Sequence, residues 1–139
     1  MSFTLTREHA AAIFDPVNEG NRAAFADALD PEVRWVVASE NKDPMRLTGI
    51  YNKASWYAEV MAALAARLDN NKAKIVSVEV VNNKAIVEGV GEATQKNGKP
   101  YYNRFALFFK FSSETGKIVE VNEYVDTAML QEVMQTNPL

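Results

Sequence analysis

The sequence predicts an α+β domain in which helices cover one face of a curved, antiparallel-rich sheet. Apolar residues recur at helical spacing through much of the first half of the chain. The second half instead contains short alternating segments separated by tight turns. One of those segments carries two glycines, which permit sharp coiling of a strand. A chain of 139 residues can bury a substantial core, so we expect one domain spanning residues 1–139.

The N-terminal residues predict two short helices. The first begins after Thr4 or Thr6, either of which can cap it, and Pro16 bends or ends it. Asn21 caps the second helix. The pair Asp30-Pro31 stops that helix, because a residue before proline disfavours helical backbone.

A strand and a longer helix follow. Residues 33–39 alternate in polarity, with Trp35 on the apolar face, where it serves either the core or a pocket wall. Residues 53–68 give the strongest helical signal in the chain, an apolar stripe that includes Trp56. Glu59 flanks this stripe and is a candidate second acid.

The second half predicts a β meander that ends in a short helix. Turns at Asn82-Asn83, Asn97-Gly98 and Glu114-Thr115-Gly116 separate the strands. Asp126 and Thr127 can cap the last helix, residues 128–134. Helices followed by antiparallel hairpins give the α+β class. The expected strands are 75–81, 85–94, 101–111 and 117–127.

One carboxylic acid interrupts the apolar face of the last strand. Glu123 shares that face with Val119, Val121 and Val125. An unpaired ionised carboxylate on a buried surface is costly, so Glu123 must be paired, neutral or solvated in a cavity. Two interpretations stay open. One is a structural hydrogen bond or a strand end that turns to solvent; the other is an acid in an apolar pocket, where burial raises its pKa and suits it to proton transfer.

Small side chains on strand 85–94 favour a hollow sheet. Gly89 and Gly91 lie on one face of this strand, together with alanine and valine, and leave room beside the backbone. A kinked strand packed tightly against a helix is the alternative.

The neighbouring strand places polar groups at one end of a hydrocarbon surface. Tyr101 and Asn103 share a face with Phe105 and Leu107. If this face and Glu123 point inward together, Tyr101, Asn103 and Glu123 converge near one end of an apolar cavity. Hydrophobic walls with a few placed polar groups are typical of small-molecule sites.

Composition excludes several classes of function. Fifteen basic and eighteen acidic side chains give a formal charge of −3, which argues against a nucleic-acid or membrane partner. Without cysteine and with a single histidine, thiolate chemistry and a histidine-rich metal site are excluded, and we expect no metal or cofactor. The first ten residues lack the apolar core of a signal peptide, and no apolar run reaches membrane-spanning length. We therefore expect a cytoplasmic protein.

The order of elements resembles the SnoaL-like polyketide cyclase family over nearly the whole chain. The motifs that carry the resemblance are the Trp-bearing strand, Leu47-x-Gly-x-Tyr51, the long helix and the closing Gly-Lys-Ile-Val-Glu-Val-Asn-Glu-Tyr-Val-Asp-Thr. This family belongs to the α+β superfamily of nuclear transport factor, ketosteroid isomerase and limonene epoxide hydrolase. The resemblance implies a mixed sheet shaped as a cone, three N-terminal helices over it, and a homodimer packed sheet to sheet. Its interface would use Tyr102, Arg104, Ala106 and Phe108.

The resemblance also assigns roles to single positions. It implies a general acid/base on the last strand, where Glu123 stands. Tyr101 and Phe105 occupy positions where related isomerases place tyrosines, so Phe105 lacks one of those hydroxyls. The epoxide hydrolases carry an arginine and an aspartate where this chain has Gly89 and Gly91, which excludes epoxide hydrolysis.

Together these observations predict a cofactor-free isomerase or cyclase acting on a hydrophobic, carbonyl-bearing metabolite of polyketide or terpenoid type. Glu123 would move a proton while Tyr101 and Asn103 hold the substrate oxygen. The alternative is a non-catalytic ligand-binding or dimerisation module, which a basic partner for Glu123 would favour. Phe14 stands nearest to the first-helix tyrosine of ketosteroid isomerase, so that chemistry is not expected. The expected substrate-contacting residues are Phe14, Trp35, Tyr51, Trp56, Glu59, Phe105, Leu107, Val121 and Val125.

Overall fold

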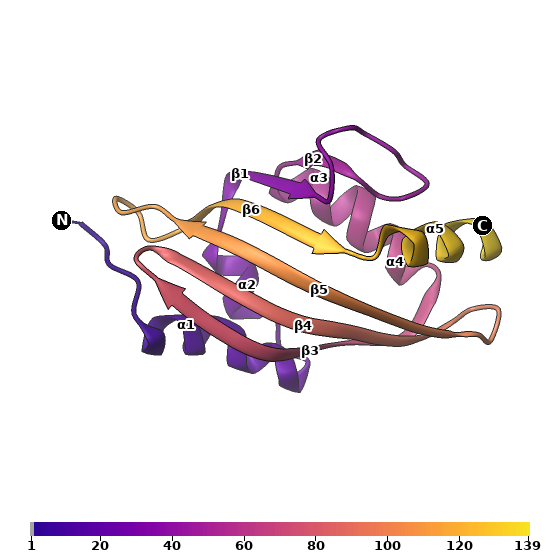
Figure 1. The fold of residues 1–139 in the computed structure, drawn as a ribbon, viewed down its shortest axis with the longest axis horizontal. Coiled ribbons are helices and arrows are strands. Elements are labelled where there is room, and N and C mark those ends of the chain that lie inside the picture. Colours follow the sequence, from indigo (N-terminus) through magenta and orange to yellow (C-terminus); the bar gives the residue numbers. More distant parts are fainter. Residues whose placement is uncertain (1) are drawn as a thin grey trace.

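A curved sheet lies over a layer of helices in the computed structural model, which describes residues 2–139 (Figure 1). The sheet has six strands in the order β2-β1-β6-β5-β4-β3 and is open, with β2 and β3 at its edges. Only β1 and β6 pair in parallel, so the sheet is mixed and antiparallel-rich, and the predicted fold class is confirmed. The strands are β1 (Leu29–Val37), β2 (Gly49–Tyr51), β3 (Leu68–Val81), β4 (Lys84–Gln95), β5 (Pro100–Phe111) and β6 (Ile118–Val125).

The three N-terminal helical segments are present, and two of them are divided. Pro16 lies at the start of a 3₁₀ turn that continues the first helix, which Thr6 caps by accepting from the His9 N–H at 3.1 Å. The third segment contains a π-helix in its middle. A C-terminal helix follows Asp126, whose side chain caps it as predicted. The segments are α1 (Arg7–Phe14) with η1 (Asp15–Glu19), α2 (Ala23–Ala28), α3 (Lys53–Ser55) with η2 (Trp56–Met61) and α4 (Ala62–Ala65), and α5 (Thr127–Thr136).

Strand β1 begins earlier and ends earlier than the predicted 33–39. Its pairing with β6 is interrupted between Leu29 and Arg34, and Pro31, which cannot donate to a neighbouring strand, lies in that irregular part. Ala38 has a φ of 59°, a left-handed conformation that ends the strand after Val37. The apolar alternation of the sequence therefore shows only the regular half of this strand.

Strand β3 corrects the predicted end of the long helix. Helical structure stops at Ala65, and Leu68 already pairs with Gln95 in β4, seven residues before the predicted strand 75–81 begins. The added segment is rich in lysine and asparagine and lies at a sheet edge, where exposed charged residues protect an unpaired strand. A polar edge strand carries little of the alternation from which strands are recognised.

Three neighbouring strands turn the same face towards the helices. Val121 in β6 lies opposite Trp35 in β1 and Phe109 in β5, and all three side chains are at most 1% exposed. Because side chains alternate along a strand, Glu123 also points towards the helices, two residues beyond Val121. The strand register therefore places the carboxyl group of Glu123 on the helix-facing side of the sheet, just beyond these closely packed core residues.

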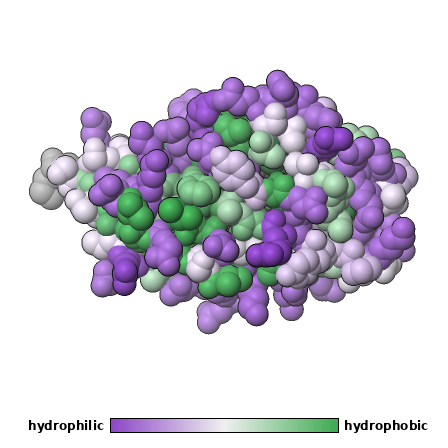
Figure 2. Space-filling view, viewed as in Figure 1, coloured by the Kyte–Doolittle hydropathy of each residue, from purple (hydrophilic) through white to green (hydrophobic). Residues whose placement is uncertain are grey.

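The opposite face of the sheet is free of helices and partly apolar. Tyr102, Phe108 and Tyr124 lie there with exposed fractions of 54%, 38% and 55%. The rings of Phe108 and Tyr124 pack edge to face across β5 and β6, with centroids 5.8 Å apart. In the view of Figure 2, hydrophobic residues gather over the sheet within a largely hydrophilic surround. Exposed apolar clusters of this kind mark interaction surfaces.

The two strand glycines differ in how closely other groups approach them, which gives a matched test of the sheet's curvature. A methyl group added at Gly89 would collide with the Phe105 ring and lie 2.7 Å from the backbone oxygen of Lys74. A methyl at Gly91 would meet the Tyr101 ring at 3.5 Å and the backbone oxygen of Asn103 at 3.8 Å, both ordinary contact distances. We expect Gly89→Ala to lower the free energy of unfolding by about 1–3 kcal/mol and Gly91→Ala to change it by about 0.5 kcal/mol or less. Urea unfolding measures both, and equal stability of the two variants would contradict the close approach at Gly89.

Candidate functional site

A cavity of about 160 Å³ lies between the inner face of the sheet and the helices. Most of its wall is hydrocarbon and aromatic, contributed by four strands of the meander and by β1, η2 and the flanking helices. A few polar side chains interrupt that wall, as small-molecule sites require. They are Arg22, Tyr57, Asn71, Tyr101, Asn103 and Glu123.

Glu123 reaches the cavity from β6 with apolar neighbours on both sides. Val37 and Leu107 lie opposite it on the two adjoining strands. The Nε1 atom of Trp35 donates a hydrogen bond of 2.8 Å to its Oε1. No lysine or arginine within residues 2–139 forms an ion pair with it, so the basic partner that would favour a purely structural role is not found there. The carboxyl is only partly exposed, and it lines the cavity.

Burial raises the pKa of Glu123 to about 7, against an ordinary value of 4.5. Desolvation of the charged form is the main cause, and the indole N–H groups of Trp35 and Trp56 act in the opposite direction by favouring the carboxylate. The indole of Trp56 stacks on that of Trp35, with ring centroids 3.9 Å apart and planes 20° apart. Its Nε1 atom is buried and has no hydrogen-bond partner among the described residues. Neutral donors therefore support the charge only in part, and the proton can be gained or lost near neutral pH.

Tyr101 presents a protonated hydroxyl at the same cavity. Burial is the main reason that the pKa of this phenol rises to about 12, and the charge of Glu123 adds to the shift. The Nδ2 atom of Asn103 donates to the Tyr101 oxygen at 3.3 Å and to the backbone oxygen of Asp126 at 3.1 Å. Since the phenol oxygen already accepts from Asn103, its own proton remains for another acceptor.

Asn103 is more constrained than the sequence suggested. Its Oδ1 accepts from the backbone N–H of Asp126 at 3.0 Å, so both ends of the amide join β5 to the start of α5. The side chain is 2% exposed, and both of its N–H groups already have acceptors within the protein. This geometry suits Asn103 to orienting Tyr101 rather than to donating directly to a ligand.

The π-helix determines which helical side chains reach the cavity. A capping box between Asn52 and Ser55 starts the segment, and the wider turn of η2 then directs two pairs of side chains inward, together with Leu64 of α4. The π-helix contributes Trp56, Tyr57, Val60 and Met61. Sequence periodicity does not distinguish this turn from an α-helical one, and π-bulges are often found at functional sites.

Six of the nine predicted wall residues line the cavity, and Tyr51, Glu59 and Val121 do not. Val121 is fully buried between Trp35 and Phe109 on the two adjoining strands, and of these three only Val121 does not line the cavity. The Tyr51 hydroxyl lies 3.0 Å from the backbone oxygen of Leu47 and 3.1 Å from that of Thr48, and so fixes the loop before β2. The residues that do line the cavity are Phe14, Trp35, Trp56, Phe105, Leu107 and Val125.

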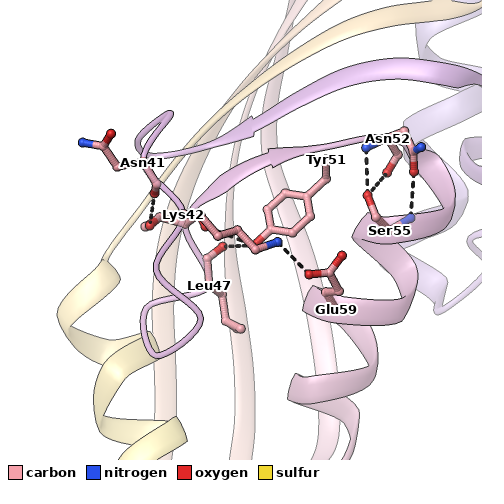
Figure 3. Close-up of polar contacts among 8 residues, drawn as sticks. Asn41, Lys42, Leu47, Tyr51, Asn52, Ser55 and Glu59 are labelled. Carbon is pink, nitrogen blue, oxygen red and sulfur yellow. Dashed lines mark hydrogen bonds and ion pairs between the residues drawn. The ribbon is translucent and has the colours of Figure 1, made fainter.

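Glu59 belongs to a contact on the outer side of the helix. Figure 3 shows Lys42 reaching past the Tyr51 ring to Glu59, with an Nζ–Oε1 distance of 2.6 Å. The ammonium lies 4.2 Å from the ring centroid, and both charged side chains are about half exposed. Such a pair contributes little to stability but ties the loop to η2. Glu59 is therefore not a second acid of the cavity.

Three polar residues of the wall were not predicted as site residues. Tyr57 was visible only as part of the helix's apolar stripe, Asn71 lies in the unpredicted part of β3, and Arg22 precedes α2 without a motif around it. These positions line one cavity only in the folded chain, through the π turn and the curvature of the sheet. Neither feature can be recognised from the pattern of residues in the sequence.

Among residues 2–139, no group of three or more acidic or histidine side chains is arranged to hold a metal ion. Within the same residues, no helix is long and apolar enough to cross a membrane.

An open sheet curved around a cavity with one acid and a few donors defines an α+β domain with a hollow core. The profile of the SnoaL-like domain matches residues 10–121, and the chain belongs to that family. Monooxygenase ptaG of Pestalotiopsis fici is 39% identical over 77 residues, which are 53% of this chain and 54% of ptaG. The chain thus matches about half the length of this curated relative.

Solved structures share the fold at low sequence identity. An NTF2-like protein of Burkholderia thailandensis matches with a TM-score of 0.73 and 21% identity, covering 92% of this chain and 95% of that one. BvnE pinacolase of Penicillium brevicompactum matches with a TM-score of 0.68 and 16% identity, covering 93% and 94%. The expected family and fold are confirmed.

The raised pKa of Glu123 predicts an unusual dependence of stability on pH. Between about pH 4.5 and about pH 7 the folded protein keeps a proton that the unfolded chain has released, so stability falls as pH rises through this range. Glu123→Gln cannot titrate and removes this contribution. Relative to that variant, the wild-type protein should lose about 2–3 kcal/mol of unfolding free energy across the range. Urea unfolding of both proteins at several pH values measures the difference, and a difference that does not vary with pH would contradict the raised pKa.

Proposed function

We propose that this protein is a cofactor-independent isomerase or cyclase that moves a proton at a carbon next to a carbonyl group in a hydrophobic metabolite. The observation that carries the proposal is the carboxyl of Glu123, whose pKa lies near 7 in an apolar cavity with two indole donors beside it. A general acid/base is most effective when its pKa is close to the working pH. The secondary-metabolite substrate, of polyketide or terpenoid type, is part of the same proposal.

The proton transfer follows from the hydrogen bonds of the site. Oε1 of Glu123 is held by Trp35, so Oε2 is the oxygen free to remove a proton from the substrate carbon. The electrons of the broken C–H bond move onto the carbonyl oxygen, where the Tyr101 hydroxyl donates a hydrogen bond to the developing enolate. The Nε1 of Trp56, which has no hydrogen-bond partner among the described residues, favours the charged form of Glu123.

Completion of the reaction needs no further catalytic group. In an isomerisation, protonated Glu123 returns its proton to a different carbon of the conjugated system. In a cyclisation, the enolate carbon attacks a second carbonyl carbon, and Glu123 returns the proton to the new alkoxide. The dry, aromatic wall holds one folded conformation of the substrate, which favours ring closure entropically.

The cavity limits what can react inside it. At about 160 Å³ it is similar in size to an engineered cavity of about 150 Å³ that holds benzene. The reacting part of the substrate is therefore one ring or an equivalent folded chain, and the rest of a larger polyketide extends towards the opening.

A proton-exchange assay tests Glu123 without knowledge of the natural substrate. β-Tetralone is a small apolar ketone with acidic α-protons, and its deuterium uptake from D₂O can be followed by NMR. The wild-type protein should accelerate the exchange, with a rate that rises with pH through about 7 as the base form appears. Glu123→Gln should slow the catalysed exchange by about 10²-fold or more while tetralone affinity is kept.

Glu59→Gln is the matched control for this assay. It makes the same chemical change in an acid that pairs with Lys42 outside the cavity, so its exchange rate should equal that of the wild type. Equal rates for Glu123→Gln and the wild type would remove Glu123 as the proton carrier.

The name of the curated relative favours a second candidate function that begins with the same step. After proton removal, a carbanion at an activated methylene can react with O₂; the methylene becomes a carbonyl and one molecule of water is released, so no other reductant is needed. The 39% identity to monooxygenase ptaG over about half of this chain supports this route. Oxygen uptake during turnover separates it from isomerisation, which consumes none.

We further propose that the helix-free face of the sheet forms a homodimer. The apolar cluster of Tyr102, Phe108 and Tyr124 supports a sheet-to-sheet contact with a second copy of the chain. Phe108→Glu should convert the dimer to a monomer in light scattering, because a carboxylate at the centre of the contact would be desolvated. Met45→Glu, at an exposed apolar residue in the loop before β2, should leave the dimer unchanged. A monomeric wild-type protein would contradict the proposal.

A further inference from the structure

A second group of polar side chains lines the cavity away from Glu123. Arg22, Tyr57 and Asn71 are each half-buried and belong to its wall. Within residues 2–139, none of the three side chains makes a hydrogen bond, and Arg22 forms no ion pair. Polar side chains in a cavity wall that have no partner within the protein are available to a ligand.

Arg22 and Tyr57 both line the cavity, and the charge of Arg22 lowers the pKa of Tyr57, against the larger raising effect of burial. A guanidinium, a phenol hydroxyl and an amide together offer several N–H and O–H donors. The guanidinium can present two parallel donors to a planar carboxylate.

The fold separates this group from the acid. Asn71 lies on β3 and Glu123 on β6, with β4 and β5 between them. Glu123 pairs with Leu107, Leu107 with Val87 and Val87 with Val78, so Asn71 lies three strands across and seven residues along the sheet from Glu123. Strands β4 and β5 between them contribute apolar residues to the wall, together with Tyr101 and Asn103. The cavity wall thus carries Glu123 and Asn71 at well-separated places.

We propose that Arg22, Tyr57 and Asn71 form a carboxylate-binding subsite, so that the substrate has an apolar, carbonyl-bearing body and a carboxylate at the end remote from Glu123. This inference deepens the proposed function, on which its biological meaning rests. The subsite fixes the direction in which the substrate enters, because a carboxylate placed beside Glu123 would meet a second acid with no cation nearby.

Binding of a matched pair of probes tests the subsite. Phenylvalerate and phenylvaleramide have the same ring and chain and differ only in their terminal carboxylate or amide. The two tryptophans of the chain, Trp35 and Trp56, both line the cavity, so quenching of their fluorescence reports binding. At about pH 6, where Glu123 is largely protonated, and at low salt, we expect the acid to bind about tenfold more tightly than the amide.

Variants assign that preference to Arg22. Arg22→Gln should reduce the acid-to-amide affinity ratio to about one, and Arg22→Lys, which keeps the charge without the fork, should keep part of it. Arg7→Gln changes the net charge equally at an exposed position of α1 and should keep the full ratio. If Arg22→Gln does not fold, a ratio unchanged in Arg22→Lys and insensitive to salt would still overturn the subsite.

These measurements distinguish failure of the carboxylate subsite from failure of the proposed function. Glu123→Gln should lose tetralone exchange and keep the acid-to-amide ratio, because the ratio depends on Arg22 and not on Glu123. Equal affinity of the two probes for the wild type, a ratio that survives Arg22→Gln, or no binding of either probe would overturn the carboxylate subsite.

Discussion

The hydrogen bond from the Trp35 indole to Glu123 is the interaction on which the site depends. It joins the two strands that pair in parallel, β1 and β6, which are the first and the last strands along the chain. A lysine in place of the indole would hold the carboxyl permanently ionised, and a wall of hydrocarbon alone would hold it permanently protonated. A neutral donor leaves the two forms nearly balanced, which is the condition for giving and taking a proton repeatedly.

The stability contributed by the buried residues next to Glu123 offsets the cost of keeping an acid in a cavity. Trp35, Phe109 and Val121 are almost completely buried, and they pack in register immediately below the carboxyl. The same row of side chains therefore supplies both buried core and cavity wall, because Trp35 and Phe109 also line the cavity. Gly91 lines the cavity as well, and Gly89 leaves room for the Phe105 ring.

Most of the fold could be predicted from the sequence because its signals are local. Alternation and turn residues locate β4, β5 and β6 to within one or two residues, and capping residues locate α1 and α5. The first half of β3 was not predicted as a strand, because its role as a polar edge strand depends on the neighbour with which it pairs and not on its own sequence pattern.

The site was predictable only where one strand carried the information. Glu123 was found because it breaks an apolar alternation, and Tyr101 because it shares a face with Phe105. Arg22, Tyr57 and Asn71 come from three elements that meet only in space. Glu59 was predicted to lie near the cavity because helical spacing cannot show that Lys42, from a distant loop, pairs with it on the outer side of the helix.

The π turn of η2 has a consequence for how this cavity can be altered. Each residue of an α-helix advances by about 100° around the axis, so eight residues of α-helix would turn Leu64 about 80° away from Trp56. The wider π turn removes this offset, and both side chains line the same cavity. Deletion of one residue from 56–61 would restore α geometry and leave Trp56 and Leu64 seven residues apart, a spacing at which they again share one face of the helix. Such a deletion would change only which of the residues between them line the cavity, and it would leave the sheet and the rest of the helix in place.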